Sequence, residues 1–196
     1  MKKTIAEGSI PELATEGQIA LDVMRKRRTI RHFTDDDISQ KEVETLLEIA
    51  MCAPNRLDRR PWHFVVIRDK ELQRQLADLL RVHPYLEAAP VVIAVCGLPK
   101  VSPTWIMDVS AATENMLLAA TAVGLGATWV GPHDTVLWDR CEEMLHDALA
   151  IPGEDIRIPA LVAVGHPAQE LPPHGRHDRF DPTRVHYGSW GTHEPK

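Results

Sequence analysis

The sequence predicts an α/β or α+β sandwich, because short strand-like runs alternate with longer helical patterns along the chain. The runs 63–67 and 90–96 are short and rich in β-branched residues, which is typical of strands. The second run is continuously apolar, as expected of a strand buried on both faces. The much longer stretch 105–123 is apolar nearly all round in its second half, which predicts a central buried helix.

The remaining elements follow from periodicity and from residues that end helices. The acidic run at 35–37 favours the start of a helix, and Pro54 ends that helix after about residue 52. Gly124 is suited to end the long helix in a left-handed conformation. The expected order is helix 18–27, helix from 37 to about 52, strand 63–67, helix 70–81, strand 90–96, helix 105–123, strand 127–130, helix 136–150 and strand 158–164.

The length of 196 residues indicates a single domain over 1–196 that can bury a core of its own. Its N-terminus, 1–16, is expected to be loose. The segment 168–196 is rich in Pro, His and Arg and has no periodicity. A tail of this kind usually covers its own domain or a partner subunit, so we expect it to be extended and to cover the ligand site or the partner.

Composition excludes several classes of function. The chain has 22 Lys+Arg and 28 Asp+Glu, a net charge of −6 that argues against a nucleic-acid partner. Its longest nearly apolar run, 88–98, is shorter than the about 20 residues of a membrane span, and no signal peptide is recognisable. Three scattered cysteines without a C-x-x-C motif fit a reducing compartment, so we expect a cytoplasmic protein. The histidine cluster at 174–178 lacks a second set of ligands, so no metal is expected.

The segment 25–31 concentrates positive charge inside this acidic chain. It contains Arg25, Lys26, Arg27, Arg28 and Arg31. One interpretation is a solvated helix end, where cations are favoured by the helix dipole. The other is an anion site, since guanidinium groups bind phosphate with two parallel hydrogen bonds and the Thr29 hydroxyl can donate a third.

Three further segments indicate no function when each is taken alone, but their order along the chain is informative. The first is the loop 53–64, Ala-Pro-Asn-Arg-Leu-Asp-Arg-Arg-Pro-Trp-His-Phe, and the second is 115–132, with Gly-Leu-Gly at its centre. The third is 159–167, which is followed by Arg176 and by Val-His-Tyr-Gly-Ser-Trp at 185–190. The Gly-x-Gly lies between a helix and a strand, the wrong order for a dinucleotide fingerprint.

Together with Arg-Arg-Thr-Ile-Arg at 27–31, these segments resemble the nitroreductase family of FMN-dependent oxidoreductases over nearly the whole chain, from about residue 21 to 190. The resemblance implies a three-layer α/β/α sandwich with a central, mainly antiparallel sheet. It also implies a homodimer that holds two FMN molecules at the subunit interface.

The resemblance also implies site residues. Arg27, Arg28 and Thr29 would bind the FMN phosphate, and Arg31 would approach the flavin N1/O2 edge, where a cation stabilises the anionic reduced flavin. The other cofactor-binding residues would be Pro54 and Asn55, which reach the partner's flavin, the backbone of Trp129, Val130 and Gly131 at the other face or the N5 edge, and Arg176, which returns to the phosphate.

One loop departs from the usual family pattern of Pro-Ser-Ser/Ala-x-Asn-x-Gln-Pro-Trp. Asn55 replaces a serine, Asp58 the asparagine and Arg60 the glutamine. Ionised Asp58 can accept a hydrogen bond from flavin N3–H but cannot donate one, so Arg60 would have to supply the missing donor.

The implied activity is reduction of nitroaromatics, quinones or activated alkenes with NADH or NADPH as the transient reductant. Hydride would pass through flavin N5 in a ping-pong sequence, so no protein nucleophile is required. Two alternatives stay open. The first is a flavoenzyme of the same scaffold that carries out dehalogenation, heterocycle oxidation or flavin cleavage, and the second is a non-catalytic FMN-binding module.

Overall fold

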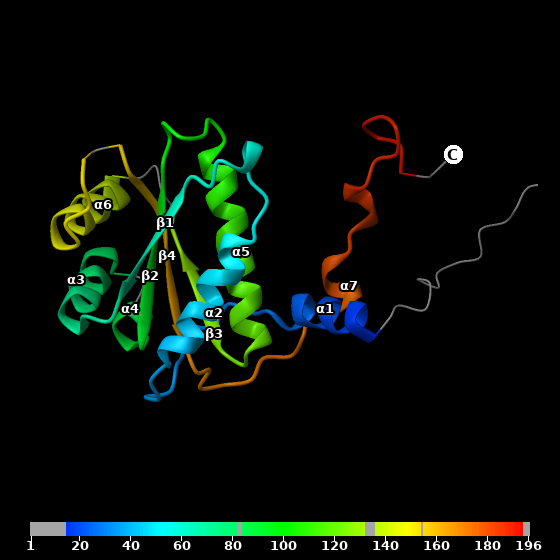
Figure 1. Cartoon of the computed structure of the whole chain (residues 1–196). Coiled ribbons are helices and arrows are strands. Elements are labelled where there is room, and N and C mark those ends of the chain that lie inside the picture. Colours follow the sequence, from blue (N-terminus) through cyan, green and yellow to red (C-terminus); the bar gives the residue numbers. More distant parts are fainter. Residues whose placement is uncertain (1–14, 82–83, 132–135, 154, 194–196) are drawn as a thin grey trace, which may run out of the picture. The chain divides into compact units, whose positions relative to one another are not determined.

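The computed structural model describes residues 15–81, 84–131, 136–153 and 155–193 (Figure 1). The chain divides into two compact units. One consists of residues 27–170 and contains the sheet, and the other combines residues 1–26 with 171–196.

The sheet of the larger unit has four antiparallel strands in the order β1-β2-β4-β3. The central strands β2 and β4 are buried almost throughout, which explains why their sequences are continuously apolar. Strand β2 carries a register shift between Val95 and Gly97 in its pairing with β4. The strands are β1 (Trp62–Ile67), β2 (Val91–Gly97), β3 (Gly126–Val130) and β4 (Arg157–Gly165).

Helices cover both faces of this sheet, as Figure 1 shows. On one face α2 (Gln40–Met51) and α5 (Trp105–Ala122) pack over a core that contains Ile93 and Val95 of β2. On the other face lie α3 (Lys70–Leu80), α4 (Tyr85–Ala88) and α6 (Val136–Ala148), over a core that contains Val92, Ala94 and Cys96. The alternation along β2 therefore separates two cores, and the expected three-layer α+β architecture is confirmed.

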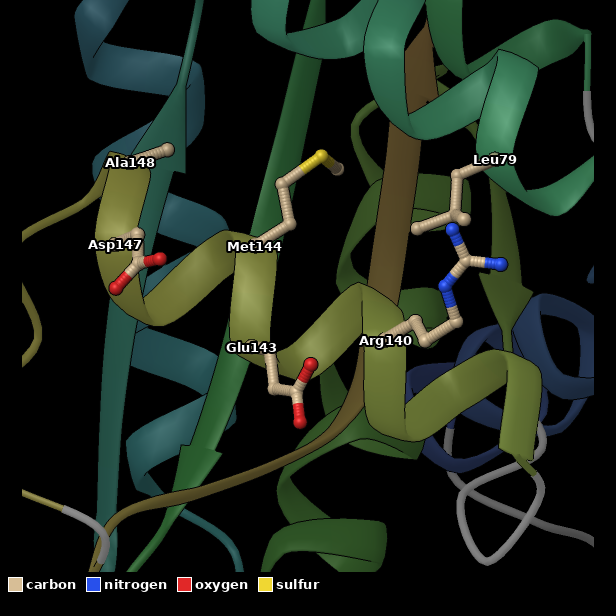
Figure 2. A pocket seen from close by; sticks show the side chains of 6 residues that line it. All are labelled: Leu79, Arg140, Glu143, Met144, Asp147 and Ala148. Atoms are coloured by element: carbon tan, nitrogen blue, oxygen red, sulfur yellow. The ribbon is translucent and has the colours of Figure 1, made fainter.

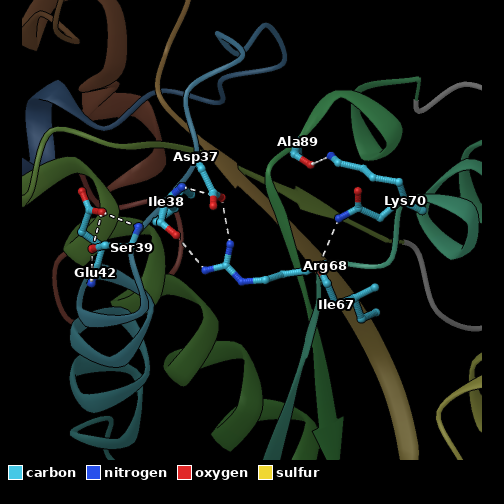
Figure 3. Close-up of polar contacts among 9 residues, drawn as sticks. Asp37, Ile38, Ser39, Glu42, Ile67, Arg68, Lys70 and Ala89 are labelled. Atoms are coloured by element: carbon cyan, nitrogen blue, oxygen red, sulfur yellow. Dashed lines mark hydrogen bonds and ion pairs between the residues drawn. The ribbon is translucent and has the colours of Figure 1, made fainter.

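A polar network fixes the chain where it enters α2 (Figure 3). Ser39 and Glu42 form a capping box, in which Ser39 Oγ accepts from Glu42 N at 3.2 Å and the Glu42 carboxylate accepts from Ser39 N at 2.8 Å. Arg68, directly after β1, donates to Asp37 Oδ1 at 2.9 Å and to Ile38 O at 2.7 Å. The segment that precedes α2 is thus tied to the end of β1.

The smaller unit has little core. Helix α1 (Thr15–Lys26) has no buried residue, and its Arg25 carbonyl accepts a hydrogen bond from His174 N at 2.8 Å. Within the expected tail the structure has the short helices α7 (Arg176–Arg179) and η2 (Pro182–Arg184). The tail is therefore not wholly extended, and these two short helices, like α4, have no counterpart in the sequence-based prediction.

Among the described residues, no helix is both long and apolar enough to cross a membrane. Within the same residues, no group of three or more His, Cys, Asp or Glu side chains is arranged to hold a metal ion.

Candidate functional site

The arginine-rich segment that follows α1 runs beside the edge strand β3. Thr29 forms an isolated parallel bridge with Ala127, and Ile30 N donates to Ala127 O at 3.0 Å. The approach requires a glycine in β3, because a Cβ at Gly126 would lie 2.8 Å from Ile30 side-chain atoms. The arginine-rich segment 25–31 and the segment 115–132, about 100 residues apart in the chain, are therefore neighbours in space.

Arg27 forms an ion pair with the long helix α5. Its Nε lies 3.3 Å from Glu114 Oε1 of α5, and both side chains are partly exposed, by 30% and 44%. Arg27 Nε is itself buried and makes no hydrogen bond with any described residue. The ion pair is therefore loose, and the guanidinium retains N–H groups that can meet another acceptor.

A cavity of about 200 Å³ opens on the stretch of α5 that precedes Glu114. Two hydroxyls in its wall are occupied within the helix, since Ser110 Oγ donates to Ile106 O and Thr113 Oγ1 to Val109 O. The wall that remains is largely apolar, which suits an aromatic ring system. Its lining residues are Ile106, Val109, Ser110, Thr113, Trp129, Gly131, Pro159 and Ala160.

This cavity is smaller than the about 300–1,000 Å³ typical of ligand pockets. Trp129 and Gly131 line this cavity together with residues of α5 from Ile106 to Thr113. Glu114, which pairs with Arg27, follows directly in the same helix. Val130 has a fully buried side chain in the opposite core, so only its backbone could face a ligand.

The loop between α2 and β1 is held by its own side chains. Asn55 Oδ1 accepts from Arg60 N at 2.8 Å, and the Arg60 guanidinium donates to both oxygens of Asp58 at 2.7 and 2.8 Å. The Arg60 bonds hold the pKa of the Asp58 carboxyl below its usual value, so the pair is charged at neutral pH. Leu57, Asp58 and Arg60 all have φ near +50°, a left-handed conformation that costs free energy for such residues.

A buried carboxylate anchors this loop to α5. Asp108, only 6% exposed, accepts from Ser102 Oγ at 2.8 Å, from Thr104 Oγ1 at 3.2 Å and from Arg56 N at 3.3 Å. Sequence reasoning missed Asp108 as a buried anchor, which Ser102 and Thr104, just before the helix, could have signalled.

Other predicted site residues do not line this cavity, and one of them is only partly described. Arg31 places its Cζ 5.8 Å from the ring centre of Tyr85, whose side chain belongs to the core on the α3–α4–α6 face. Arg28 is half-buried and Pro54 is exposed. Arg176 opens α7 in the smaller unit, and its side chain lies outside the described part of the chain.

Two larger hollows border α6. One, of about 590 Å³, lies between α6 and Leu79 of α3 (Figure 2), and another, of about 720 Å³, lies between α6 and the start of β4. None of the predicted site residues lines either of them. The smaller cavity on α5 is therefore the candidate site, because Trp129 and Gly131 line it and Arg27 contacts the same helix at Glu114.

Arg27 and Thr29 fit a flavin phosphate by the chemistry of their donors. Arg27 has a buried N–H without a hydrogen-bond acceptor among the described residues. Thr29, two residues later in the chain, is exposed and carries a hydroxyl group. A phosphate would accept hydrogen bonds from these donors, and the apolar wall of the cavity on α5 could pack against an isoalloxazine ring.

Comparison with known proteins identifies the family to which the chain is similar. Residues 24–84 and 83–166 match the model described as the Nitroreductase family. An Archaeoglobus fulgidus protein with the provisional name NADH dehydrogenase/NAD(P)H nitroreductase is 38% identical over 176 residues, which cover 87% of this chain and 98% of that protein.

Two solved structures are similar in sequence and in fold. A Parabacteroides distasonis protein with the same provisional name is 30% identical, with a TM-score of 0.80 over 87% of this chain and 98% of that one. A Desulfovibrio desulfuricans structure, described as a nitroreductase in complex with FMN, is 34% identical, with a TM-score of 0.68 over 76% of this chain and 87% of that one.

Proposed function

Because this chain belongs to the nitroreductase family, we propose that it is an FMN-dependent oxidoreductase that reduces nitroaromatics, quinones or activated alkenes with NADH or NADPH. The observation that carries the proposal is the convergence of Arg27 and the segment Trp129–Gly131, at the end of β3, on one stretch of α5. A cation for a phosphate and a cavity for a ring are what a flavin mononucleotide needs.

Each group of residues has a role in this proposal. Arg27, Arg28 and Thr29 bind the phosphate, and the backbone of Trp129–Gly131 borders the ring at its N5 edge. Bound FMN supplies hydride and electron transfer, so the chain contributes binding, orientation and electrostatics.

Arg31 is proposed to serve the flavin N1/O2 edge. Its observed contact with Tyr85 is a cation–π contact, worth about 0.5–1 kcal/mol at an exposed site. A charge-assisted contact with the flavin would exceed this value and would reorient the guanidinium. There the cation would favour the anionic reduced flavin.

We also propose a homodimer in which Pro54 and Asn55 reach the partner's flavin and the tail, with Arg176, covers the site. The small volume of the cavity supports this, since one subunit would supply only part of a flavin pocket. Exposed apolar side chains on the α2–α5 layer also support it, among them Met51 at 52% and Met107 at 71%.

The decisive experiment is the visible spectrum of the purified protein, before and after NADH or NADPH under anaerobic conditions. A yellow protein that releases flavin on denaturation and bleaches with a dinucleotide is the expected result. A colourless protein that FMN cannot reconstitute would exclude the proposal.

The altered loop favours a second candidate. The Asp58–Arg60 pair stands where the family pattern has neutral asparagine and glutamine. Tight FMN binding without reduction by either dinucleotide would indicate a flavoenzyme of different reaction or a non-catalytic FMN-binding module. A panel of halogenated and heterocyclic substrates would then separate those two.

A further inference from the structure

The loop 55–60 carries more positive charge than its own contacts neutralise. It contains three arginines and one aspartate. Both carboxylate oxygens of Asp58 accept hydrogen bonds from Arg60, through Nε and Nη2. Two guanidinium groups, those of Arg56 and Arg59, therefore lack a carboxylate partner among the described residues. Both residues are exposed, in a chain whose net charge is −6.

The loop orients the guanidinium of Arg59 and fixes the backbone from which the Arg56 side chain extends. Arg59 Nη1 donates to Val101 O at 3.0 Å, which orients the guanidinium and leaves its other N–H groups open. The backbone of Arg56 is fixed by the buried Asp108, and Arg59 N donates to Arg56 O at 3.1 Å. Preorganised guanidinium groups bind oxyanions with a smaller loss of conformational entropy.

The position of the loop relates it to the candidate site. Its anchor, Asp108, belongs to the same turn of α5 as Ile106, Val109 and Ser110, which line the cavity. The loop also holds three residues in left-handed backbone conformations, and such strain persists where the surroundings fix it, often at ligand sites.

We propose that residues 55–60 form an anion-recognition loop at the flavin site, in which Arg56 and Arg59 bind an oxyanion of the substrate. This inference rests on the proposed flavin-dependent function. The ligand group is a carboxylate on the electron acceptor or a phosphate of the nicotinamide dinucleotide, because both present paired oxygens to a guanidinium. The enzyme should accordingly prefer anionic substrates to neutral ones of similar shape.

The test compares charged and neutral partners on the FMN-loaded protein. Acceptors are 4-nitrobenzoate and nitrobenzene, and hydride donors are NADPH, NADH and the phosphate-free 1-benzyl-1,4-dihydronicotinamide. The variants are Arg56→Gln, whose side chain has no hydrogen-bond or ion-pair partner within the described residues, and Arg59→Gln. The matched control is Arg140→Gln, an exposed arginine on α6.

Each loop variant should raise KM for the anionic partner about tenfold and leave the neutral partner within twofold. A change with 4-nitrobenzoate assigns the loop to the acceptor, and a change with the dinucleotides assigns it to phosphate. The Kd of the anionic partner whose KM rises, 4-nitrobenzoate or NADP⁺, should rise by a similar factor when it is followed through the spectrum of oxidised FMN without any turnover. Arg59→Lys should restore most of the affinity.

Loop variants that match Arg140→Gln with every partner would overturn the anion-recognition loop while the flavin function stands. Failure of the wild-type protein to bind FMN would instead remove the proposed function on which the inference rests. Raised KM values for charged and neutral partners alike would show that the substitutions act on loop structure and would also overturn the inference.

Discussion

Two Arg–Glu pairs, one on each face of the sheet, differ in how completely they are satisfied. On the α6 face, Arg157 donates to both oxygens of Glu142 at 2.9–3.1 Å, and Ile158 N donates to the same carboxylate. On the α5 face, Arg27 approaches Glu114 at 3.3 Å and leaves a buried N–H without an acceptor. The first pair is closed on itself, and the second leaves capacity for a ligand.

The difference teaches how to separate a structural ion pair from a candidate site. Glu142 has a side chain only 10% exposed, next to a buried Trp138 whose Nε1 donates to Ile158 O at 2.7 Å. Removing such a pair should act on stability. The Glu114 carboxylate is 44% exposed and should contribute little to stability, so changes there should act on ligand binding.

The largest expected contrast between the two faces concerns the thiols. Cys96 and Cys141 are fully buried on the α6 face, whereas Cys52, which ends α2 on the other face, is exposed. We expect Cys52 to react with a thiol reagent at pH 8 at least about a thousandfold faster than the other two, whose reaction requires unfolding. Mass spectrometry after timed labelling measures this, and equal rates would show that the α6 face opens readily.

The same buried thiols predict a loss of stability at alkaline pH. Burial and the nearby Glu142 raise the pKa of both Cys96 and Cys141 from 9.0 to about 12. Between these values the unfolded chain holds fewer protons than the folded chain, so the free energy of unfolding falls as pH rises from about 9 to about 12. Urea titrations at several pH values check the slope, which Cys96→Ser and Cys141→Ser together should reduce.

Next in size is the closed pair itself. Glu142→Gln removes the charge that Arg157 and Ile158 N meet, and we expect the free energy of unfolding to fall by about 2 kcal/mol, roughly thirtyfold in the equilibrium. The value lies below the about 3–5 kcal/mol for breaking a fully buried pair because the Arg157 side chain is 37% exposed. Chemical denaturation measures the loss, and FMN affinity at low temperature should be unchanged.

The open pair should give the reverse result. Arg27→Ala removes a charge-assisted donor to the proposed phosphate, and we expect FMN to bind about tenfold to thirtyfold more weakly with less than about 1 kcal/mol change in stability. Quenching of FMN fluorescence on titration with apoprotein gives the Kd. An unchanged Kd would take Arg27 out of the flavin site.

Sequence reasoning was strongest where one interaction dominates. The strand 90–96 and the long helix follow from burial alone, and the structure has β2 at Val91–Gly97 and α5 at Trp105–Ala122. Helix α4 is only four residues long, and no periodicity can develop over so short a stretch.

The membership of the flavin site stays a prediction, whereas several contacts of its proposed residues could not be predicted from the sequence. The order of the motifs assigned Arg27 and Trp129 to one predicted site. Nothing in the neighbouring sequence indicates that Arg27 contacts Glu114, 87 positions later, or that Arg31 lies over the ring of Tyr85. The Asp58–Arg60 bond likewise depends on the left-handed conformations of Asp58 and Arg60, and arginine does not favour that conformation. Such pairings depend on tertiary geometry.

The smallest expected effect tests whether Glu114 competes with the ligand. A phosphate held by Arg27 would lie close to the Glu114 carboxylate, and two negative charges repel. Glu114→Gln should therefore tighten FMN binding about threefold at low ionic strength, and the gain should vanish in high salt, where exposed charges are screened. In the Arg27→Ala background the same substitution should give a different change, and the coupling free energy from this double-mutant cycle measures how far the two side chains act as one unit toward the phosphate. Weaker FMN binding in Glu114→Gln would instead mean that the carboxylate orients Arg27 for the phosphate, and the open pair would then resemble the closed one more than its geometry suggests.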